Sequence, residues 1–194
     1  MKHLRYLLII GLIAWFFLPA YAADWQLDSE RSAITYLSSK QATIDTSMIF
    51  ESNLFHKFSA SIKDSQLELT IDLSSLDTKV AIRDERVAEH VFLTQQYPYA
   101  VVTATIDDIE QITYQRLQTT AMLAMRGQSH SVQAELIIER INPDTLRIQT
   151  VTPVLVDANA YGMLEGFAKL KALVGLMQIP TVIPVSLHLV FNAQ

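Results

Sequence analysis

Apolar and polar residues alternate with a period of two in many short segments of this chain. Residues 67–73 alternate Leu and Ile with Glu, Thr and Asp, as expected of a strand with one buried face. Similar alternation occurs over 146–156 and 182–191. Turn signals at 126–129 and 142–144 separate further segments, since Gly and Asn-Pro-Asp favour tight turns. The pattern predicts a mainly β fold built as a meander.

The remaining strands follow from the same pattern. A first strand or hairpin is expected around Ser29 and Glu30. Two strands or one strongly bent pair are expected over 45–62, with a break near Ser52 and Asn53. Further strands are expected over 109–126 and 132–141. If the last strand pairs with the first, the sheet closes into a barrel without free edges.

Two helices interrupt the strands. The first is predicted near 80–94, where valines recur at three- to four-residue spacing, with Asp77 or Thr78 as the cap and Tyr97-Pro98 as the stop. The second is an amphipathic helix near 161–178, ended by Ile179-Pro180. Such helices are expected to cover an end of the barrel.

Residues 1–22 have the pattern of a cleaved signal peptide. A basic start precedes an apolar run over 7–18 and a small-x-small triplet over 20–22, so cleavage is expected after Ala22 or Ala23. An uncleaved anchor is the alternative, although the run is shorter than the roughly 20 residues that span a bilayer. The chain has no cysteine, which is compatible with a bacterial-type periplasm. Periplasmic localisation is therefore predicted.

Charge and length restrict the function further. Removing Lys2 and Arg5 with the leader leaves 13 of the 15 basic residues against 20 acidic ones, a net charge of about −7. This balance disfavours nucleic acid as a partner, because such binding depends on phosphate neutralisation by Lys and Arg. Residues 23–194 contain no long linker or low-complexity segment and are expected to form one domain.

Several motifs in this order resemble the YceI-like family of exported lipid- or polyisoprenoid-binding proteins. They are Trp25-x-Leu27-Asp28-x-x-x-Ser32, Phe55-x-x-Phe58-Ser59, Ile71-Asp72-x-x-Ser75-Leu76-Asp77-Thr78, Ile82-Arg83-Asp84-Glu85-Arg86, Tyr97-Pro98 and Leu123-x-x-Arg126-Gly127. The resemblance spans nearly all of residues 23–194. It implies a single antiparallel eight-stranded lipocalin-like β-barrel that holds a long apolar chain, with no catalytic activity assigned to the shared motifs.

Two positions depart from the family pattern. Val102 stands where the family commonly has an aromatic residue, and Ala60 stands where a glycine is usual. A smaller residue at 102 would widen the cavity that the resemblance implies.

The charged residues of the first helix have two interpretations. In one, Arg83 and Arg86 meet a polar or anionic ligand head at the barrel mouth, since a guanidinium suits phosphate oxygens. In the other, Arg83 and Asp84 pair with each other or with Asp77 and fix the helix to the rim.

The apolar candidates either line a lipid cavity or fill an ordinary core, since an eight-stranded barrel is just wide enough for either. The predicted lining or mouth residues, the two arginines included, are Phe50, Phe58, Arg83, Arg86, Val102, Ala104, Met125 and Phe167.

The sequence gives no pattern for catalysis or for a cofactor. The histidines are scattered without metal-ligand spacing, and no Gly-x-Ser-x-Gly or phosphate-binding loop occurs. We therefore predict a non-enzymatic periplasmic carrier that sequesters a long-chain isoprenoid, quinone or fatty acyl compound, with no metal and no catalytic residue. Transient membrane contact and a homodimer are compatible with this prediction. The alternatives are an outer-membrane β-barrel and a lipid-modifying enzyme that uses the same pocket.

Overall fold

The computed structural model describes residues 24–194, so the predicted leader lies outside the described residues. The strands in this range are β1 (Trp25–Leu27), β2 (Ala33–Lys40), β3 (Ile49–Phe55), β4 (Phe58–Lys63), β5 (Gln66–Asp72), β6 (Leu76–Asp77), β7 (Tyr99–Thr105), β8 (Tyr114–Met125), β9 (Gln128–Asn142), β10 (Thr145–Thr150), β11 (Val154–Asp157) and β12 (Val182–Ala193). The helical elements are η1 (Leu73–Ser75), α1 (Ala81–Val87), the π-helical turn η2 (Ala88–Phe92), η3 (Ile109–Gln111) and α2 (Leu164–Val174).

The strands form a closed antiparallel barrel of eight strands, as predicted. Closure runs through β1, which pairs with β12 on one side and with β4 on the other. The short segments β1 and β2 follow one another along β12, and β3 and β4 follow one another across a break at 56–57. Each of these pairs therefore acts as one interrupted barrel strand, and so do β10 and β11, which both pair with β12; the two-residue β6 only extends the sheet beside β3.

Tight hairpins set the register of the meander. The two-residue turns Asp64-Ser65 and Arg126-Gly127 have positive φ at both residues, between 47° and 72°. This backbone twist matches that of the flanking strands, so the turns join β4 to β5 and β8 to β9 directly. The predicted turn at 126–129 is confirmed, and Pro143-Asp144 makes the predicted turn between β9 and β10.

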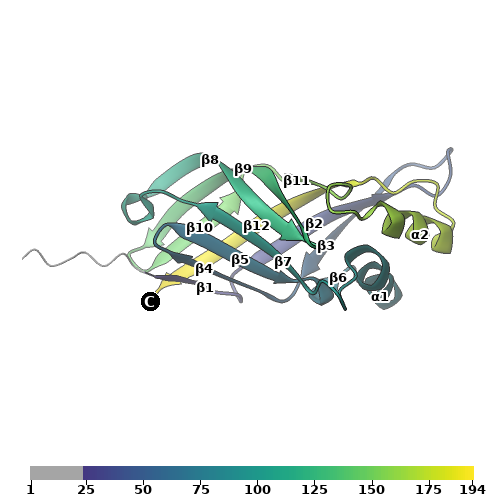
Figure 1. Cartoon of the computed structure of the whole chain (residues 1–194). Helices are drawn as coiled ribbons and strands as arrows, with labels where there is room; N and C mark the ends of the chain where they lie inside the picture. Colours follow the sequence, from purple (N-terminus) through teal and green to yellow (C-terminus); the bar gives the residue numbers. More distant parts are fainter. Residues whose placement is uncertain (1–23) are drawn as a thin grey trace, which may run out of the picture.

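The two ends of the barrel differ (Figure 1). Helices α1 and α2 lie together at one end, which we call the helical end, and the C-terminus lies at the other. We call that other end the closed end. There η3 is joined to β1, because Trp25 Nε1 donates a 3.0 Å hydrogen bond to Glu110 Oε1.

Several predicted boundaries differ from the structure. Strand β3 continues through Ser52 and Asn53 and breaks at His56-Lys57, where the joint is hydrogen-bonded to Ser75. The predicted alternation over 146–156 is split at 151–153, so that β11 pairs with β12 separately from β10.

The predicted helices exist, with corrections at their ends. The first helix covers 81–92 as α1 and η2, but neither Asp77 nor Thr78 caps it, and its N-cap is Val80 without a side-chain hydrogen bond. The second helix ends at Val174, before Ile179-Pro180, because Gly175 takes the left-handed conformation that commonly terminates helices.

Candidate functional site

A cavity of about 540 Å³ lies inside the barrel and reaches the two helices. Inward-facing residues of β2, β5, β7, β8, β9 and β12 form its walls, and residues of α1, η2 and α2 cover it. The volume falls within the range of about 300–1,000 Å³ that is usual for small-molecule sites. Most lining side chains are apolar, so the cavity suits a hydrophobic guest.

Small inward-facing residues explain why the barrel is hollow here. Ala100 and Ala104 on β7, Ala121 on β8 and Ala134 on β9 all line the cavity. Larger side chains at such positions would fill an eight-stranded barrel, because its interior is only just wide enough for side chains. Alanines on three adjacent strands therefore leave space along one wall.

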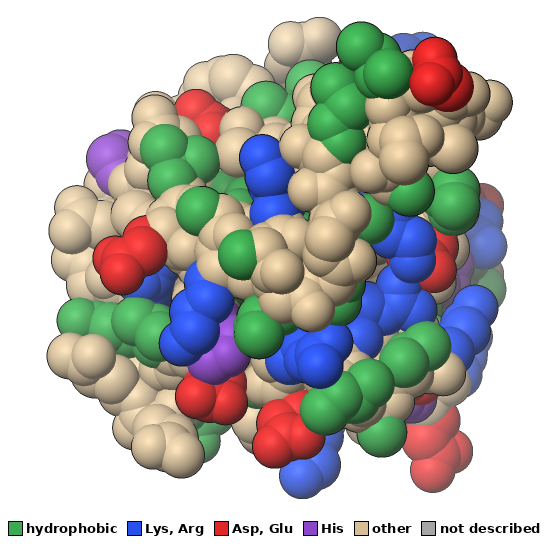
Figure 2. Space-filling view, turned by 90° about the vertical axis from the view of Figure 1, so that its right-hand side faces the viewer, with side chains coloured by type: hydrophobic (Ala, Val, Ile, Leu, Met, Phe, Trp, Pro, Cys, Tyr) green, Lys and Arg blue, Asp and Glu red, His purple; other side chains and the backbone are tan. Residues whose placement is uncertain are grey.

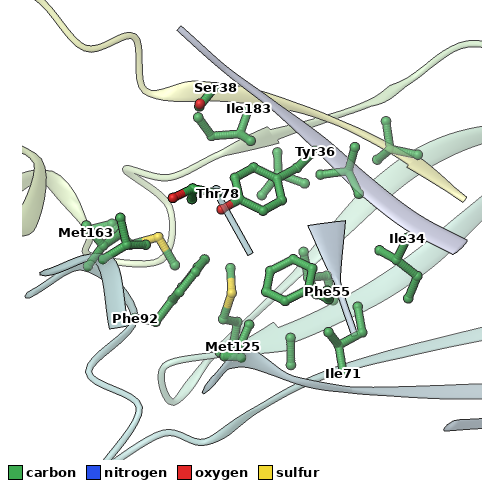
Figure 3. A pocket seen from close by; sticks show the side chains of 18 of the residues that line it. Ile34, Tyr36, Ser38, Phe55, Ile71, Thr78, Phe92, Met125, Met163 and Ile183 are labelled. Carbon is green, nitrogen blue, oxygen red and sulfur yellow. The ribbon is translucent and has the colours of Figure 1, made fainter. Parts of the chain in front are cut away.

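Aromatic and methionine side chains make the wall nearest the helices (Figure 3). The rings of Tyr36 and Phe55 lie 5.3 Å apart between centroids, and those of Phe55 and Phe92 lie 6.0 Å apart. Met125 and Met163 also line this part of the cavity. Methionine side chains adapt to guests of irregular shape, so this wall can follow a flexible chain.

The closed end contains no comparable space. Phe191, Ile138, Leu146 and Leu189 are each fully buried and do not line the cavity. Beneath them Arg140 lies 5.0 Å from the centre of the Trp25 ring and donates hydrogen bonds to the backbone of η3. The cavity therefore lies toward the helical end, where its lining residues Val80, Ile82 and Val174 are exposed.

The helices at the mouth are in close contact through Gly166 of α2. A side-chain carbon at this position would lie 2.2 Å from the backbone oxygen of His90 in η2. Only glycine allows this approach, which holds α2 against η2 over the cavity. The surface of this end mixes exposed hydrophobic side chains with Lys and Arg (Figure 2), and it includes Val80, Ile82 and Val174, which also line the cavity.

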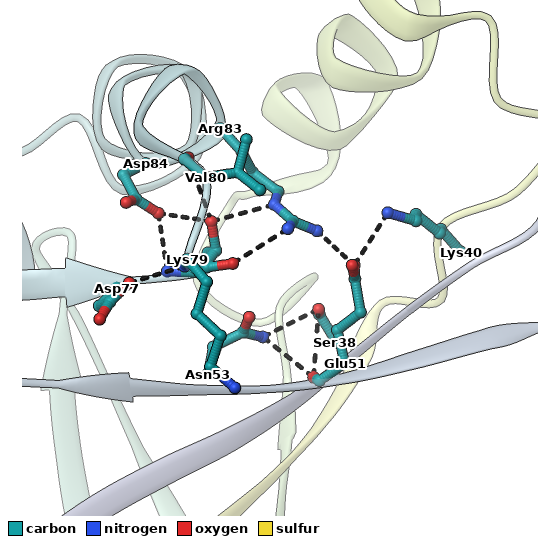
Figure 4. A network of polar contacts seen from close by, with 10 residues as sticks. Ser38, Lys40, Glu51, Asn53, Asp77, Lys79, Val80, Arg83 and Asp84 are labelled. Atoms are coloured by element: carbon teal, nitrogen blue, oxygen red, sulfur yellow. Dashed lines mark hydrogen bonds and ion pairs between the residues drawn. The ribbon is translucent and has the colours of Figure 1, made fainter.

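Arg83 is the centre of a polar network at the rim (Figure 4). Its guanidinium pairs with Glu51 of β3 and donates to both Thr78 Oγ1 and the Thr78 carbonyl at 3.0 Å. Lys40 Nζ lies 2.9 Å from Glu51 Oε2, and Thr78 Oγ1 donates to Asp84 Oδ1 at 2.5 Å. The network ties α1 to the rim of the barrel.

This network bears on both interpretations of Arg83. Arg83 ties α1 to the rim, but the expected partners were wrong, because it pairs with Glu51 and Thr78 instead of Asp84 or Asp77. Asp84 accepts hydrogen bonds from the backbone N–H and the hydroxyl of Thr78, while Asp77 is hydrogen-bonded to the His56 ring. Arg83 also lines the cavity, so its paired guanidinium stands at the cavity rim.

The rim perturbs two titrating groups in opposite directions. Burial alone would raise the pKa of Glu51, but hydrogen bonds from Lys40 and Arg83 outweigh it and hold the pKa below its ordinary value. Burial raises the pKa of the Tyr36 phenol far above its ordinary value, and Asp84 adds to the rise. Glu51 is therefore charged at neutral pH, and Tyr36 is neutral.

The structure brings six of the eight predicted site residues together at the cavity. They are Arg83, Arg86, Val102, Ala104, Met125 and Phe167.

Phe50 and Phe58 do not line the cavity. Phe50 is 64% exposed because it stands five residues before the inward-facing Phe55 on the same strand, and odd spacing places the two on opposite faces. Phe58 packs against the core just after the break at 56–57, and its cross-strand partner Ile71 lines the cavity in its place. Expecting both to line the cavity was wrong.

Among the lining residues that sequence reasoning missed, Tyr36 and Glu51 bear most on the site. Tyr36 shares a face with the fully buried Ile34 two residues earlier, so strand periodicity was an available signal. Glu51 carried no local signal, since its partner Arg83 lies 32 residues away in the chain.

The family model described as the YceI-like domain matches residues 25–191. The chain belongs to the YceI-like family. A solved structure of a polyisoprenoid binding domain from Saccharophagus degradans is 25% identical, with a TM-score of 0.82 over 89% of this chain and 100% of that chain. No curated protein matched this chain.

More distant structures share the fold of this YceI-like chain. Burkholderia cenocepacia BcnA is 19% identical with a TM-score of 0.62, over 84% of this chain and 98% of its own. A YCEI protein from Campylobacter jejuni is 16% identical with a TM-score of 0.52, over 73% of this chain and 84% of its own.

The geometry gives the YceI-like motifs a physical role in this chain. Thr78, Arg83 and Asp84, which belong to two separate motifs, form the rim network. Val102, where the family commonly has an aromatic residue, lines the cavity, and Ala60 is buried outside it. These three motif residues therefore tie the first helix to the mouth of the cavity.

Searches for other kinds of site gave negative findings over residues 24–194. No cluster of three or more His, Cys, Asp or Glu side chains there is arranged to hold a metal ion. Among the helices of the same residues, none has the length and hydrophobicity needed to cross a membrane.

Proposed function

We propose that this YceI-like protein binds a long-chain hydrophobic compound in its barrel cavity and carries or sequesters it. The observation that carries this proposal is the cavity of about 540 Å³, lined mainly by apolar side chains and open toward the helical end. The barrel is hollow only where alanines replace larger inward-facing residues, so the space follows directly from the sequence.

Burial alone supplies the binding energy in this proposal. Each methylene group removed from water contributes about 0.8 kcal/mol. A chain of ten carbons therefore gains about 8 kcal/mol before the cost of association is subtracted. Affinity at this level needs no charged contact, and the length of the cavity sets which chains fit.

The ligand class we propose is an isoprenoid, a quinone or a fatty acyl compound. The Saccharophagus degradans relative is described as polyisoprenoid binding and aligns with 89% of this chain. The adaptable wall of Met125 and Met163 suits branched and unbranched chains alike.

A binding role fits the site better than catalysis. Within the described residues the lining includes no histidine and one carboxylate, Glu51, which Arg83 and Lys40 already engage. General acid–base chemistry needs a group with a pKa near neutral pH, whereas the pKa of Glu51 is lowered.

The outer face of the barrel supports an aqueous location over an outer-membrane barrel. Outward-facing positions carry ion pairs and hydrogen bonds, such as Arg116 Nε to Glu135 Oε1 at 2.6 Å and Thr120 Oγ1 to Gln133 Oε1 at 3.1 Å. A membrane barrel instead presents an apolar band to lipid. With the predicted leader over 1–22, we propose that the protein works in the periplasm.

Lipid extraction and a cavity-blocking variant test the proposal. Organic extracts of the purified protein, analysed by mass spectrometry, should contain a long-chain compound, and a fluorescent apolar probe should bind with one site per chain. Ala121→Phe places a ring in the cavity and should abolish both signals. Met122→Phe, on the outer face of the same strand, is the matched control and should preserve them. Equal binding by the two variants would disprove the proposal.

A further inference from the structure

The phenol of Tyr36 is an unpaired donor inside an apolar cavity. Its Oη is buried from solvent and has no hydrogen-bond partner among residues 24–194. Tyr36 lines the cavity, and its ring points into it between Thr78 and Phe55 (Figure 3). A buried polar group without a partner costs free energy, so such a group in a native fold calls for an explanation.

The polar side chains near Tyr36 are already committed to one another. Thr78 Oγ1 donates to Asp84 and accepts from Arg83, and Ser38 Oγ accepts from Asn53 Nδ2 at 2.9 Å. None of these groups reaches Tyr36 Oη within hydrogen-bond distance. The hydroxyls of Thr78 and Ser38 are thus engaged without the phenol, which points into the cavity.

Packing fixes the position of this donor. The Tyr36 ring lies against Phe55, which in turn lies against Phe92, so the ring is held on one side by a row of aromatic side chains. Along β2, Tyr36 stands between Ile34, which is fully buried, and Ser38, which belongs to the rim network. The Tyr36 backbone is therefore two residues inside Ser38, about 7 Å along the strand.

We propose that Tyr36 donates a hydrogen bond to an uncharged oxygen of the ligand, such as a ketone, ester, amide or alcohol oxygen near one end of its apolar chain. This inference rests on the proposed function and narrows its ligand class, because it excludes a plain hydrocarbon. The tail extends past Ala104 and Leu136 toward the closed end, and the oxygen-bearing end faces the mouth.

The charges around the phenol favour an uncharged acceptor. After burial, the pKa of Tyr36 is raised by Asp84, lowered by Arg83 and raised again by Asp77. Arg83 is itself neutralised by Glu51. The charged groups that act on the phenol are thus two carboxylates and one paired arginine, and together they carry no net positive charge.

An internal rearrangement is the competing explanation. Asn53 Oδ1 is also buried without a partner, and Asn53 stands opposite Tyr36 in the register of β2 and β3. If the two atoms pair in solution, removal of the phenol oxygen should lower the melting temperature. If the oxygen is reserved for a ligand, Tyr36→Phe should leave the ligand-free protein equally stable or more stable.

Three matched probes test the inference: dodecane, dodecan-2-one and dodecanoate, each displacing a fluorescent apolar probe from the purified protein. The wild type should bind the ketone about twofold to tenfold more tightly than the alkane, because one hydrogen bond changes the affinity by about this factor. Tyr36→Phe should remove that preference and keep alkane binding. Tyr161→Phe is the control, because Tyr161 is buried outside the cavity and its Oη donates to the Leu123 carbonyl at 3.4 Å.

The outcomes separate the two proposals. Equal affinity for ketone and alkane in the wild type, or an unchanged preference in Tyr36→Phe, overturns the Tyr36 inference and leaves the carrier function standing. Tighter binding of dodecanoate than of the ketone overturns the uncharged acceptor. A melting temperature lowered in Tyr36→Phe as much as in Tyr161→Phe assigns the phenol to Asn53. Displacement by none of the three probes contradicts the carrier function itself.

Discussion

The closed end and the helical end of the barrel are made of the same strands but have opposite interiors. At the closed end, inward positions carry Trp25, Ile138 and Phe191, which are almost completely buried and do not line the barrel cavity. Toward the helical end, the same strands carry residues such as Ala121 and Ala134, and the interior is hollow. Strand pairing sets the width of the barrel, so side-chain size alone decides which half is solid.

The difference separates stability from function along the barrel axis. The solid half buries large side chains and supplies the core, whereas the hollow half forgoes such contacts to leave room for a guest. The helical end compensates with a polar rim, since Arg83, Glu51 and Thr78 connect α1 to the barrel. Variants placed in each half can break or sharpen this division.

The largest expected effect on the free energy of unfolding comes from truncating an aromatic residue, and its size should differ between the two halves. Phe191→Ala, in the solid half, should lower the free energy of unfolding by about 3–5 kcal/mol because it leaves a new cavity. Phe167 already borders the cavity, so Phe167→Ala should lower the free energy of unfolding by less than about 1.5 kcal/mol. Urea unfolding monitored by circular dichroism measures both. Equal losses would show that the two halves contribute alike.

The contact between α2 and η2 gives the next effect. Gly166→Ala should destabilise the protein by about 1–3 kcal/mol, since the new carbon would lie 2.2 Å from the His90 oxygen. In an open helix the same change would instead stabilise by up to about 1 kcal/mol. Ala168→Ser, exposed on α2, is the control and should change the free energy of unfolding by a few tenths. A stabilised Gly166→Ala would mean that α2 does not rest on η2.

Added volume should act with opposite sign in the two halves. Ala104→Leu extends into the cavity and should stabilise the protein by about 0.5–2 kcal/mol while weakening ligand binding. Ala60→Leu is inserted next to the fully buried Leu69 and should destabilise by about 1–3 kcal/mol. Thermal unfolding of both variants, each without ligand, gives the sign. Destabilisation by both would indicate that the cavity wall cannot accept added volume.

The sequence predicted the fold better than the site, for a physical reason. Strand alternation and turn residues are local signals, so the barrel, its closure by the last strand and the turn at 126–129 were all recognisable. The interior of the barrel depends on contacts between distant strands. Glu51 and Arg83 meet only after closure, and Phe50 was misplaced because the break in the strand lies at 56–57 and not at 52–53.

The smallest effect concerns pH and the rim alone. Glu51→Gln should cost about 0.5–1 kcal/mol at pH 7, because Glu51 is partly exposed and its ion pairs are screened. The folded pKa of Glu51 is lowered, so its contribution is complete above the unfolded value of about 4.3 and is lost as the pH falls through the lower folded value. The gap between wild type and variant should therefore close below about pH 4.

Urea unfolding of both proteins between neutral pH and about pH 3 measures this gap. Glu68→Gln, on the exposed outer face of β5, is the control for general acid effects. Because Arg83, Lys40 and Glu51 belong only to the helical end, hydrogen exchange in acid should rise in α1 before it rises in β9 and β10. A gap that persists at low pH, or simultaneous loosening of both ends, would show that the solid half depends on the rim and that the two interiors are not independent.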